Sequence, residues 1–215
     1  MATRNITARI TRRARRAGVA VPGSALAPLG TYLALLSRWN QRINLTALAL
    51  DPPSDEAVDR LIVEPLVAAK QIRARDRLLI DIGSGGGSPG IPLTLAVPEL
   101  RTVLVEVKVR KSAFLREVVR QLDLQAVEVV NGRFEELLGR SDLLESADLV
   151  SLRAVRPDRR LWNGIQAFLV PGGRVLWFGS AAGKSSPALL PPLSIASRST
   201  LVASSGSELA VVVKQ

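Results

Sequence analysis

The sequence predicts an α/β fold: a helical N-terminal extension followed by a mostly parallel, seven-stranded sheet that ends in an antiparallel hairpin. From residue 77 onward, short and nearly continuous apolar runs recur, and amphipathic segments of helix length separate several of them. Strands of this kind alternate with helices in parallel sheets that are covered on both faces. Only "SGS" separates the last two runs, which is too short for a helix and predicts a hairpin with one antiparallel strand.

The extension is expected to cover residues 1–72 and the main domain residues 73–215. Residues 24–39 carry apolar side chains at helical spacing, and one stripe holds Tyr32, Leu33, Leu36 and Trp39. Residues 55–72 form a second amphipathic stretch, and the Pro-Pro-Ser of residues 52–54 is a helix-entry signal.

The main domain is expected to alternate strands and helices in chain order. The predicted strands are residues 77–83, 101–107, 127–132, 147–154, 173–179, 199–204 and 208–215. Amphipathic helices are expected at residues 110–123 and 158–169. This order predicts a single sheet that gathers the carboxyl ends of its parallel strands at one edge.

Composition excludes several classes of site and of protein. The chain has 215 residues, of which 47% are hydrophobic, so it can bury a substantial core. No window approaches the ~20 consecutive apolar residues of a membrane span, so we expect a soluble protein that does not act at a membrane. The chain has no cysteine and no histidine, which excludes disulfides, thiolate or histidine metal sites and Ser-His-Asp catalysis. We expect no bound metal.

Positive charge is concentrated at the start of the chain. Residues 1–50 contain eight arginines and no Asp, Glu or Lys, so they supply +8 of the net charge of +10. Arginine binds phosphate in a bidentate manner, and this block is a candidate contact surface for RNA or DNA. A solvated terminus or a targeting peptide would have the same composition.

A glycine-rich loop follows the first predicted strand, in "LLIDIGSGGGSPGIPL". Gly83, Gly85 and Gly87 let the backbone adopt positive φ and approach a ligand closely, although a tight turn without a ligand fits as well. The spacing is G-x-G-x-G and not the G-x-G-x-x-G of dinucleotide-binding proteins. Asp81, two residues before Gly83, would face a pyrophosphate unfavourably, so the loop favours a cationic ligand.

The second predicted strand ends in another acid, Glu106. It follows the loop at the distance where an acid hydrogen-bonds both hydroxyls of a ribose, although an exposed pair with Lys108 or Lys111 is the alternative. Together, Asp81, the loop and Glu106 describe a site for a positively charged ligand that contains adenosine and lacks phosphates. S-adenosylmethionine fits this description.

Five segments resemble a known family: "RWNQRINLTAL", "DIGSGGGSPGIPL", "VEVKVRKSAFL", "GRFEEL" and "SLRAV" are similar to the RsmG or GidB family of bacterial small-subunit ribosomal RNA guanine-N7 methyltransferases. The resemblance implies a Rossmann-like, class I S-adenosylmethionine-dependent methyltransferase fold. It places cofactor contacts at Gly83, Ser88, Phe134, Glu135 and Arg153. Its N-terminal motif falls on Trp39, Asn40, Asn44 and Thr46.

The chain also departs from that family's pattern. Residues 61–65 read Leu-Ile-Val-Glu-Pro where the family usually has His-Ile-x-Asp-Ser, Phe178 and Gly179 replace a Lys-Gly pair, and Ser88 replaces a bulky apolar residue. We interpret Leu61, Glu64, Pro65 and Phe178 as positions on surfaces that face RNA.

The expected function is methylation of guanine N7 in small-subunit ribosomal RNA. In this hypothesis Arg153 is the catalytic residue, which orients the methionine end of the cofactor, and no side chain acts as a general base. The expected partner is ribosomal RNA or the small ribosomal subunit, and we expect a cytoplasmic monomer. Alternatives are a non-catalytic RNA-binding or assembly factor on the same fold, a methyltransferase for another substrate and, less favoured by the loop spacing, an NAD-type oxidoreductase.

Overall fold

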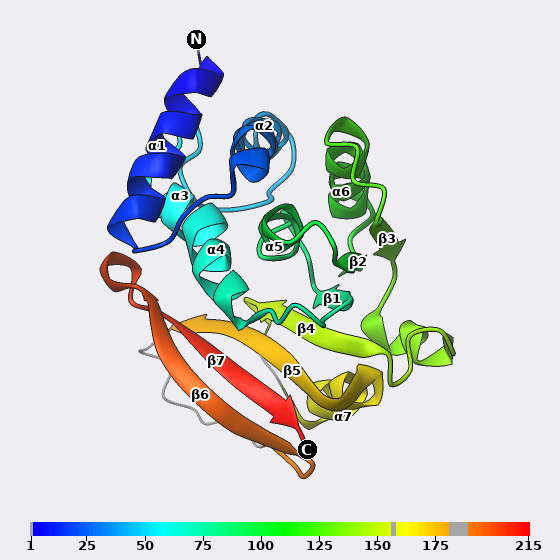
Figure 1. Ribbon diagram of the computed structural model, residues 1–215. Helices are drawn as coiled ribbons and strands as arrows, with labels where there is room; N and C mark the ends of the chain where they lie inside the picture. The colour runs from blue at the N-terminus through cyan, green and yellow to red at the C-terminus, as the bar shows by residue number, and fades with distance from the viewer. Residues whose placement is uncertain (1, 156–157, 181–188) are drawn as a thin grey trace.

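A seven-stranded sheet runs through the computed structural model, which describes residues 2–155, 158–180 and 189–215 (Figure 1). The strand order is β3-β2-β1-β4-β5-β7-β6, and β7 runs antiparallel to both of its neighbours, β5 and β6, while the other pairs of adjacent strands are parallel. The strands are β1 Leu78–Ile82, β2 Arg101–Glu106, β3 Val127–Asn131, β4 Ala147–Arg153, β5 Leu169–Ser180, β6 Leu193–Val202 and β7 Ser207–Lys214. The predicted parallel sheet with a C-terminal hairpin is confirmed, although β5 and β6 begin earlier than predicted.

Helices cover both faces of this sheet. The α-helices are α1 Ala2–Arg16, α2 Gly23–Asn40, α3 Asp55–Val58, α4 Glu64–Ala68, α5 Gly90–Ala96, α6 Val109–Gln121 and α7 Arg159–Phe168. In Figure 1, α1 to α6 lie together on one side of the sheet, while α7 lies against β5 on the other. Adjacent residues of β1 show why both faces are apolar. Leu79 packs into the cluster on the α4 and α5 side, whereas Ile80 packs into the cluster that contains α7.

Residues 55–71 form one continuous helical stretch of changing pitch. A π-helical turn, η1 (Asp59–Val63), lies between α3 and α4, and a 3-10 turn (Ala69–Gln71) ends the stretch. The hydroxyl of Ser54 accepts a hydrogen bond from the backbone N–H of Ala57, so the predicted helix-entry signal is confirmed. Within the described residues, no helix is both long enough and apolar enough to cross a bilayer.

The arginine-rich start of the chain is a packed helix. Ile10 and Ala14 of α1 are buried, and they share one apolar cluster with Tyr32 of α2 and Phe114 of α6. Leu104 of β2 belongs to the same cluster, so the N-terminal helices and the sheet share a common core.

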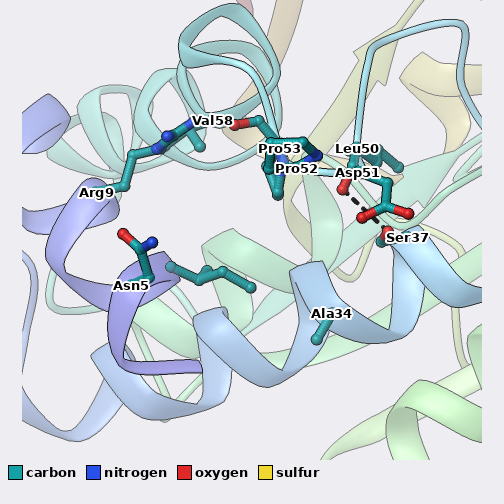
Figure 2. A pocket seen from close by; sticks show the side chains of 10 residues that line it. Asn5, Arg9, Ala34, Ser37, Leu50, Asp51, Pro52, Pro53 and Val58 are labelled. Carbon is teal, nitrogen blue, oxygen red and sulfur yellow. Dashed lines mark hydrogen bonds between the residues drawn. The ribbon is translucent and has the colours of Figure 1, made fainter. Parts of the chain in front are cut away.

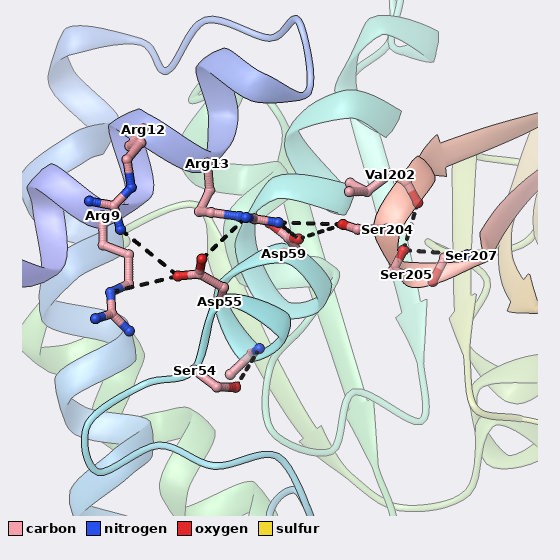
Figure 3. A network of polar contacts seen from close by, with 11 residues as sticks. Arg9, Arg12, Arg13, Ser54, Asp55, Asp59, Val202, Ser204, Ser205 and Ser207 are labelled. Atoms are coloured by element: carbon pink, nitrogen blue, oxygen red, sulfur yellow. Dashed lines mark hydrogen bonds and ion pairs between the residues drawn. The ribbon is translucent and has the colours of Figure 1, made fainter.

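Ion pairs hold α1 on the second helical stretch. Arg13 pairs with Asp59 and with Asp55, which also attracts Arg9 and Arg12 at 3.9 Å (Figure 3). Ser204, in the turn between β6 and β7, donates to Asp59 at 3.2 Å. Part of the arginine block thus serves internal structure and is not free for a nucleic acid.

Three of the residues that depart from the family pattern, Glu64, Pro65 and Phe178, are buried, so their interpretation as RNA-facing positions was wrong. Glu64 and Pro65 are buried in α4, and Phe178 is only 4% exposed in β5. Leu61, which is 7% exposed, contacts solvent only from the wall of a cavity described below. Burial explains the apolar residues at these positions, and the ion pair with Arg153 explains Glu64.

Candidate active site

Two adjoining cavities lie beyond the carboxyl ends of β1, β2 and β4. The larger has a volume of about 450 Å³ and the smaller about 230 Å³, and Gly83 and Val155 line both. The larger cavity is also lined by Leu36, Leu45, Thr46, Ala47, Leu48, Arg60, Leu61, Ser84, Gly85, Gly86, Ser88, Glu106, Lys111, Arg153 and Ala154. This is the edge of an open α/β sheet at which ligands bind.

The glycine loop is held in a conformation that requires glycine. Gly83, Gly85 and Gly87 have φ values of +73°, +53° and +89°, a region that side chains rarely adopt. The fully buried Tyr32 of α2 donates its hydroxyl to the carbonyl of Gly86 at 2.6 Å. A Cβ on Gly86 would lie 3.3 Å from a methyl group of Leu36. The N-terminal extension therefore helps to fix the loop from behind.

Glu106 lies at the junction of the loop and the second strand. One carboxylate oxygen accepts the N–H of Gly85 at 2.9 Å, and the other accepts the N–H of Lys108 at 2.7 Å. Although only 5% exposed, Glu106 lines the larger cavity. A carboxylate has about four lone-pair sites, so both oxygens can accept further hydrogen bonds from a ligand. No ion pair of Glu106 with Lys108 or Lys111 is present in the described part of the chain.

Asp81 lies beneath the loop and lines neither cavity. It is 1% exposed, and one of its oxygens accepts a hydrogen bond from Ser151 at 2.5 Å. The other oxygen would lie 2.8 Å from a Cβ at Gly90, the first residue of α5. Burial raises the pKa of Asp81 to about 6. The structure thus buries this carboxylate, which the sequence had placed facing the ligand, outside the wall of either cavity.

Arg153 reaches the larger cavity from the end of β4 but is firmly held. Its guanidinium pairs with Glu64 at 2.8 Å, donates to the carbonyl of Arg60 and lies 4.5 Å above the ring of Phe178. Ser88 does not donate into the cavity, because its hydroxyl binds the carbonyl of Leu61 at 2.9 Å. Arg153 therefore connects β4 to η1 and α4, and Ser88 connects the glycine loop to η1.

The smaller cavity is an apolar slot with a polar end. Its walls are Ile82, Gly83, Val105, Val107, Gly132, Arg133, Phe134, Glu135, Val155 and Leu161. Phe134 packs closely against α7, where a Cβ on Gly164 would lie 2.5 Å from its ring. Asn131 donates to the carbonyls of Glu106 and Val107, and it thereby fixes the strand ends rather than lining the slot. Arg133 and Glu135 face each other at 3.6 Å.

The structure thus gathers most of the predicted site residues around one hollow. Gly83, Gly85, Ser88, Glu106 and Arg153 line the larger cavity, and Phe134 and Glu135 line the smaller one. Gly87 lies against Ile91 and Tyr32 and shapes the loop from within.

Sequence reasoning missed part of the wall. It did not identify Tyr32, Arg60, Leu61 or residues 45–48 as neighbours of this cavity. The motif "RWNQRINLTAL" was the available signal, because it includes residues 45–48, but nothing in its pattern says what those residues contact.

The two cavities fit S-adenosylmethionine chemically. An apolar cavity with a carboxylate in its wall suits an adenine, and Glu106 in the wall of the adjoining cavity suits ribose hydroxyls. A Cβ on Gly85 would contact only the carbonyl of Gly83, at 3.6 Å. The described residues contain no cluster of three or more acidic side chains that could hold a metal ion.

Comparisons with known proteins agree with this geometry. Residues 25–185 match the model of the GidB family, described as rRNA small subunit methyltransferase G. A "Ribosomal RNA small subunit methyltransferase G" from Sorangium cellulosum is 40% identical over 162 residues, which are 74% of this chain and 66% of that protein. One of the same name from Stenotrophomonas maltophilia is 43% identical over 138 residues, 61% of each chain. The matched region thus spans somewhat less than two thirds of these relatives.

Solved structures share the fold at low identity. A mutant of MtNAS in complex with S-adenosylmethionine superposes with a TM-score of 0.58 at 15% identity, covering 99% of this chain and 96% of that one. A putative methyltransferase, yhhF, from Escherichia coli gives a TM-score of 0.54 at 14% identity, covering 65% of this chain and 78% of that one. These likenesses establish the architecture.

Proposed function

Because the chain belongs to the rRNA small subunit methyltransferase G family, we propose that it is an enzyme that transfers a methyl group from S-adenosylmethionine to N7 of a guanine in small-subunit ribosomal RNA. The observation that carries this proposal is the pair of cavities that meet at Gly83, with Glu106 in the wall of the larger one. A nucleoside spans both cavities, and the remaining volume of the larger one accommodates the methionine part and an acceptor.

Each part of the cofactor has a matching group in the chain. Phe134 and Glu135 hold the adenine, Glu106 accepts from the ribose hydroxyls, and the loop from Gly83 to Ser88 runs along the methionine part. Arg153 orients the methionine end with the part of its guanidinium that Glu64 and the Arg60 carbonyl leave free. Asp81 supports the loop from below, because its backbone carbonyl accepts the hydroxyl of Ser84 at 2.9 Å.

The chemistry needs positioning more than proton transfer. When bound, S-adenosylmethionine supplies a methyl group on a positively charged sulfur, which is already activated for transfer. Guanine N7 carries a free lone pair at neutral pH, so no group has to remove a proton from it first. The chain has no histidine or cysteine, which is consistent with this route. Holding the acceptor in line with the methyl carbon can lower the barrier by ~7 to 11 kcal/mol.

The proposal is tested with tritiated S-adenosylmethionine and purified small ribosomal subunits or naked ribosomal RNA. Nucleoside mass spectrometry identifies the product, and 7-methylguanosine is expected. A different methylated nucleoside would replace the proposed acceptor, and RNA binding without any transfer would favour the non-catalytic binding factor. Nicotinamide binding would favour the oxidoreductase.

The pH dependence separates N7 from acceptors that must lose a proton. The single-turnover rate at saturating cofactor and RNA is expected to be nearly flat from about pH 6.5 to about pH 9. A tenfold rise across this window would indicate an exocyclic amine or a ribose hydroxyl.

We further propose that the enzyme acts as a cytoplasmic monomer on ribosomal RNA or the small subunit. Light scattering of the free protein tests the monomer, and a dimer that is required for methyl transfer would contradict it.

A further inference from the structure

A single side chain fixes the part of the active-site wall that comes from the N-terminal extension. Asn40, the last residue of α2, accepts hydrogen bonds from the backbone N–H groups of Leu45 and Thr46 at 2.9 and 3.0 Å. Its amide nitrogen donates to the carbonyl of Thr46 at 3.0 Å. Asn40 thus satisfies three main-chain groups of one short segment.

This segment, residues 45–48, faces the larger cavity with four consecutive residues. The hydroxyl of Thr46 accepts the N–H of Leu48 at 3.2 Å, which closes a second small ring of hydrogen bonds within the segment. The carbonyl of Leu45 would lie 3.5 Å from a Cβ on Gly86, so the segment packs directly on the glycine loop. Residues 45–48 therefore form a rigid wall, although they have no helix or strand of their own.

The same stretch of chain continues away from the active site. Ser37 of α2 donates to the carbonyl of Leu50 at 3.0 Å, beside a separate cavity of about 290 Å³ (Figure 2). Figure 2 shows this separate cavity between α1, α2 and residues 50–53, with Asn5 and Arg9 on one side and Asp51 on the other. Two side chains of α2 thus hold one stretch of chain at two points, and only Asn40 acts where the stretch lines the larger cavity.

The chemistry of the wall suits a neutral ring with phosphates beside it. Leu45, Leu48 and Leu61 present apolar side chains to the cavity, while Arg60 and Lys111 also line it. In the described parts of the chain, neither cation forms an ion pair with a carboxylate. The residues assigned to the cofactor, from the loop, β2 and β4, leave this side of the cavity for the second substrate.

We propose that Asn40 is a positioning residue for the methyl acceptor: it holds residues 45–48 as the surface against which the unpaired acceptor base lies. Arg60 and Lys111 contact the phosphates beside that base. This inference rests on the proposed function, because it assigns the acceptor side of the same site. An enclosed wall of this kind requires a base that has left its helical stack.

Kinetics with three variants test the positioning role. Asn40→Ala removes all three hydrogen bonds, and we expect the KM for RNA to rise about tenfold or more while the Kd for S-adenosylmethionine stays within about twofold. Thr46→Val preserves shape but removes the acceptor for Leu48, and we expect a smaller change in the same direction. Ser37→Ala is the matched control, because it releases the same stretch of chain outside the larger cavity, and we expect no change in either constant.

The split between RNA and cofactor constants separates positioning from general damage to the fold. An equal loss of cofactor and RNA affinity in Asn40→Ala and Thr46→Val would overturn the positioning role, and so would wild-type constants in both. If Asn40→Ala does not fold, Thr46→Val decides the question by the same two constants.

A second measurement does not depend on methyl transfer. Small-subunit RNA containing 6-thioguanosine is crosslinked by light to the wild-type protein saturated with S-adenosylhomocysteine, and crosslinked peptides are mapped by mass spectrometry. Crosslinks within residues 45–48 are expected, and crosslinks found only elsewhere, or none, would overturn the assignment of this wall. Wild-type protein that crosslinks there but methylates no RNA would contradict the proposed function and leave the acceptor surface standing.

Discussion

Arg153 and Glu64 form a buried ion pair of 2.8 Å that joins the end of β4 to the first residue of α4. The Glu64 side chain is 2% exposed and that of Arg153 is 14% exposed. One oxygen of Glu64 binds Arg153, and its other oxygen has no hydrogen-bond partner among the described residues. The pair thus couples η1 and α4 to the sheet directly beside the larger cavity, where Arg60 and Leu61 form part of the wall.

Removing the carboxylate of Glu64 leaves a buried, uncompensated guanidinium. Glu64→Ala is expected to lower the free energy of unfolding by about 3 to 5 kcal/mol, because a lone buried charge is costly. Urea denaturation followed by circular dichroism measures this. Glu56→Ala, an exposed acid one helical segment away, is the control and should change stability little. A loss no larger than that of the control would show that water reaches Arg153 freely.

The hydroxyl of Tyr32 is expected to matter for the cofactor although it lies outside both cavities. Tyr32→Phe leaves the carbonyl of Gly86 without its partner, at a cost of about 1 to 3 kcal/mol, and loosens the loop. Calorimetry with S-adenosylmethionine should show affinity reduced severalfold. Ser37→Ala, which removes a similar hydroxyl-to-carbonyl bond from the same helix, should leave this affinity unchanged.

Glu106 is expected to be the strongest single determinant of cofactor affinity. Glu106→Ala removes the acceptor for the N–H of Gly85 as well as the bonds to the ribose, each worth on the order of 1.5 to 3 kcal/mol. The Kd for S-adenosylmethionine should rise at least tenfold. Glu128→Ala, on the neighbouring strand β3, removes an acid that pairs with Arg140 instead and should not affect the Kd. If Glu106→Ala and Glu128→Ala bind S-adenosylmethionine with equal affinity, Glu106 does not bind the ribose.

Asp81 should give the protein a characteristic pH dependence of stability. Burial raises the pKa of Asp81 from 3.8 to about 6, so the folded state holds the proton more tightly than the unfolded state. The contribution of Asp81 to the free energy of unfolding is therefore largest below about pH 4. It decreases by about 3 kcal/mol as the pH rises to about 6 and is constant above that pH. The stability of Asp81→Asn relative to wild type should accordingly increase between these pH values. Parallel stability curves for the two proteins would contradict the raised pKa.

Within α1, exposed and internally paired arginines should behave differently. Arg15 and Arg16 are exposed, whereas Arg13 is bound to Asp59 and Asp55. Changing both Arg15 and Arg16 to Gln should flatten the dependence of RNA binding on salt, because each phosphate contact contributes about 0.7 to 0.9 to the logarithmic slope. Arg13→Gln should instead lower the melting temperature. An unchanged slope in the double variant would exclude this face of α1 from RNA binding.

The sequence by itself determined the sheet and the glycine loop. Short, nearly continuous apolar runs that alternate with amphipathic segments of helix length indicate strands buried on both faces, and β1 is buried at every residue. The glycines at positions 83, 85 and 87 were recognisable because positive φ is a local property, which the observed angles confirm. The arrival of Glu106 at the same edge follows from parallel strands alone, since their carboxyl ends coincide.

Only the tertiary structure decided which distant residues meet. Glu64 and Arg153 are 89 positions apart in the sequence, so neither helical nor strand periodicity relates them. They meet because the fold buries both side chains beside each other. Arg13 belongs to the arginine block interpreted as a candidate contact surface for RNA or DNA, yet Asp59 neutralises it across 46 positions. Periodicity reports which face of an element is buried but not which element covers it. The partners of buried charges therefore depend on packing between elements, and this is why the wall of the active site could not be read from the sequence.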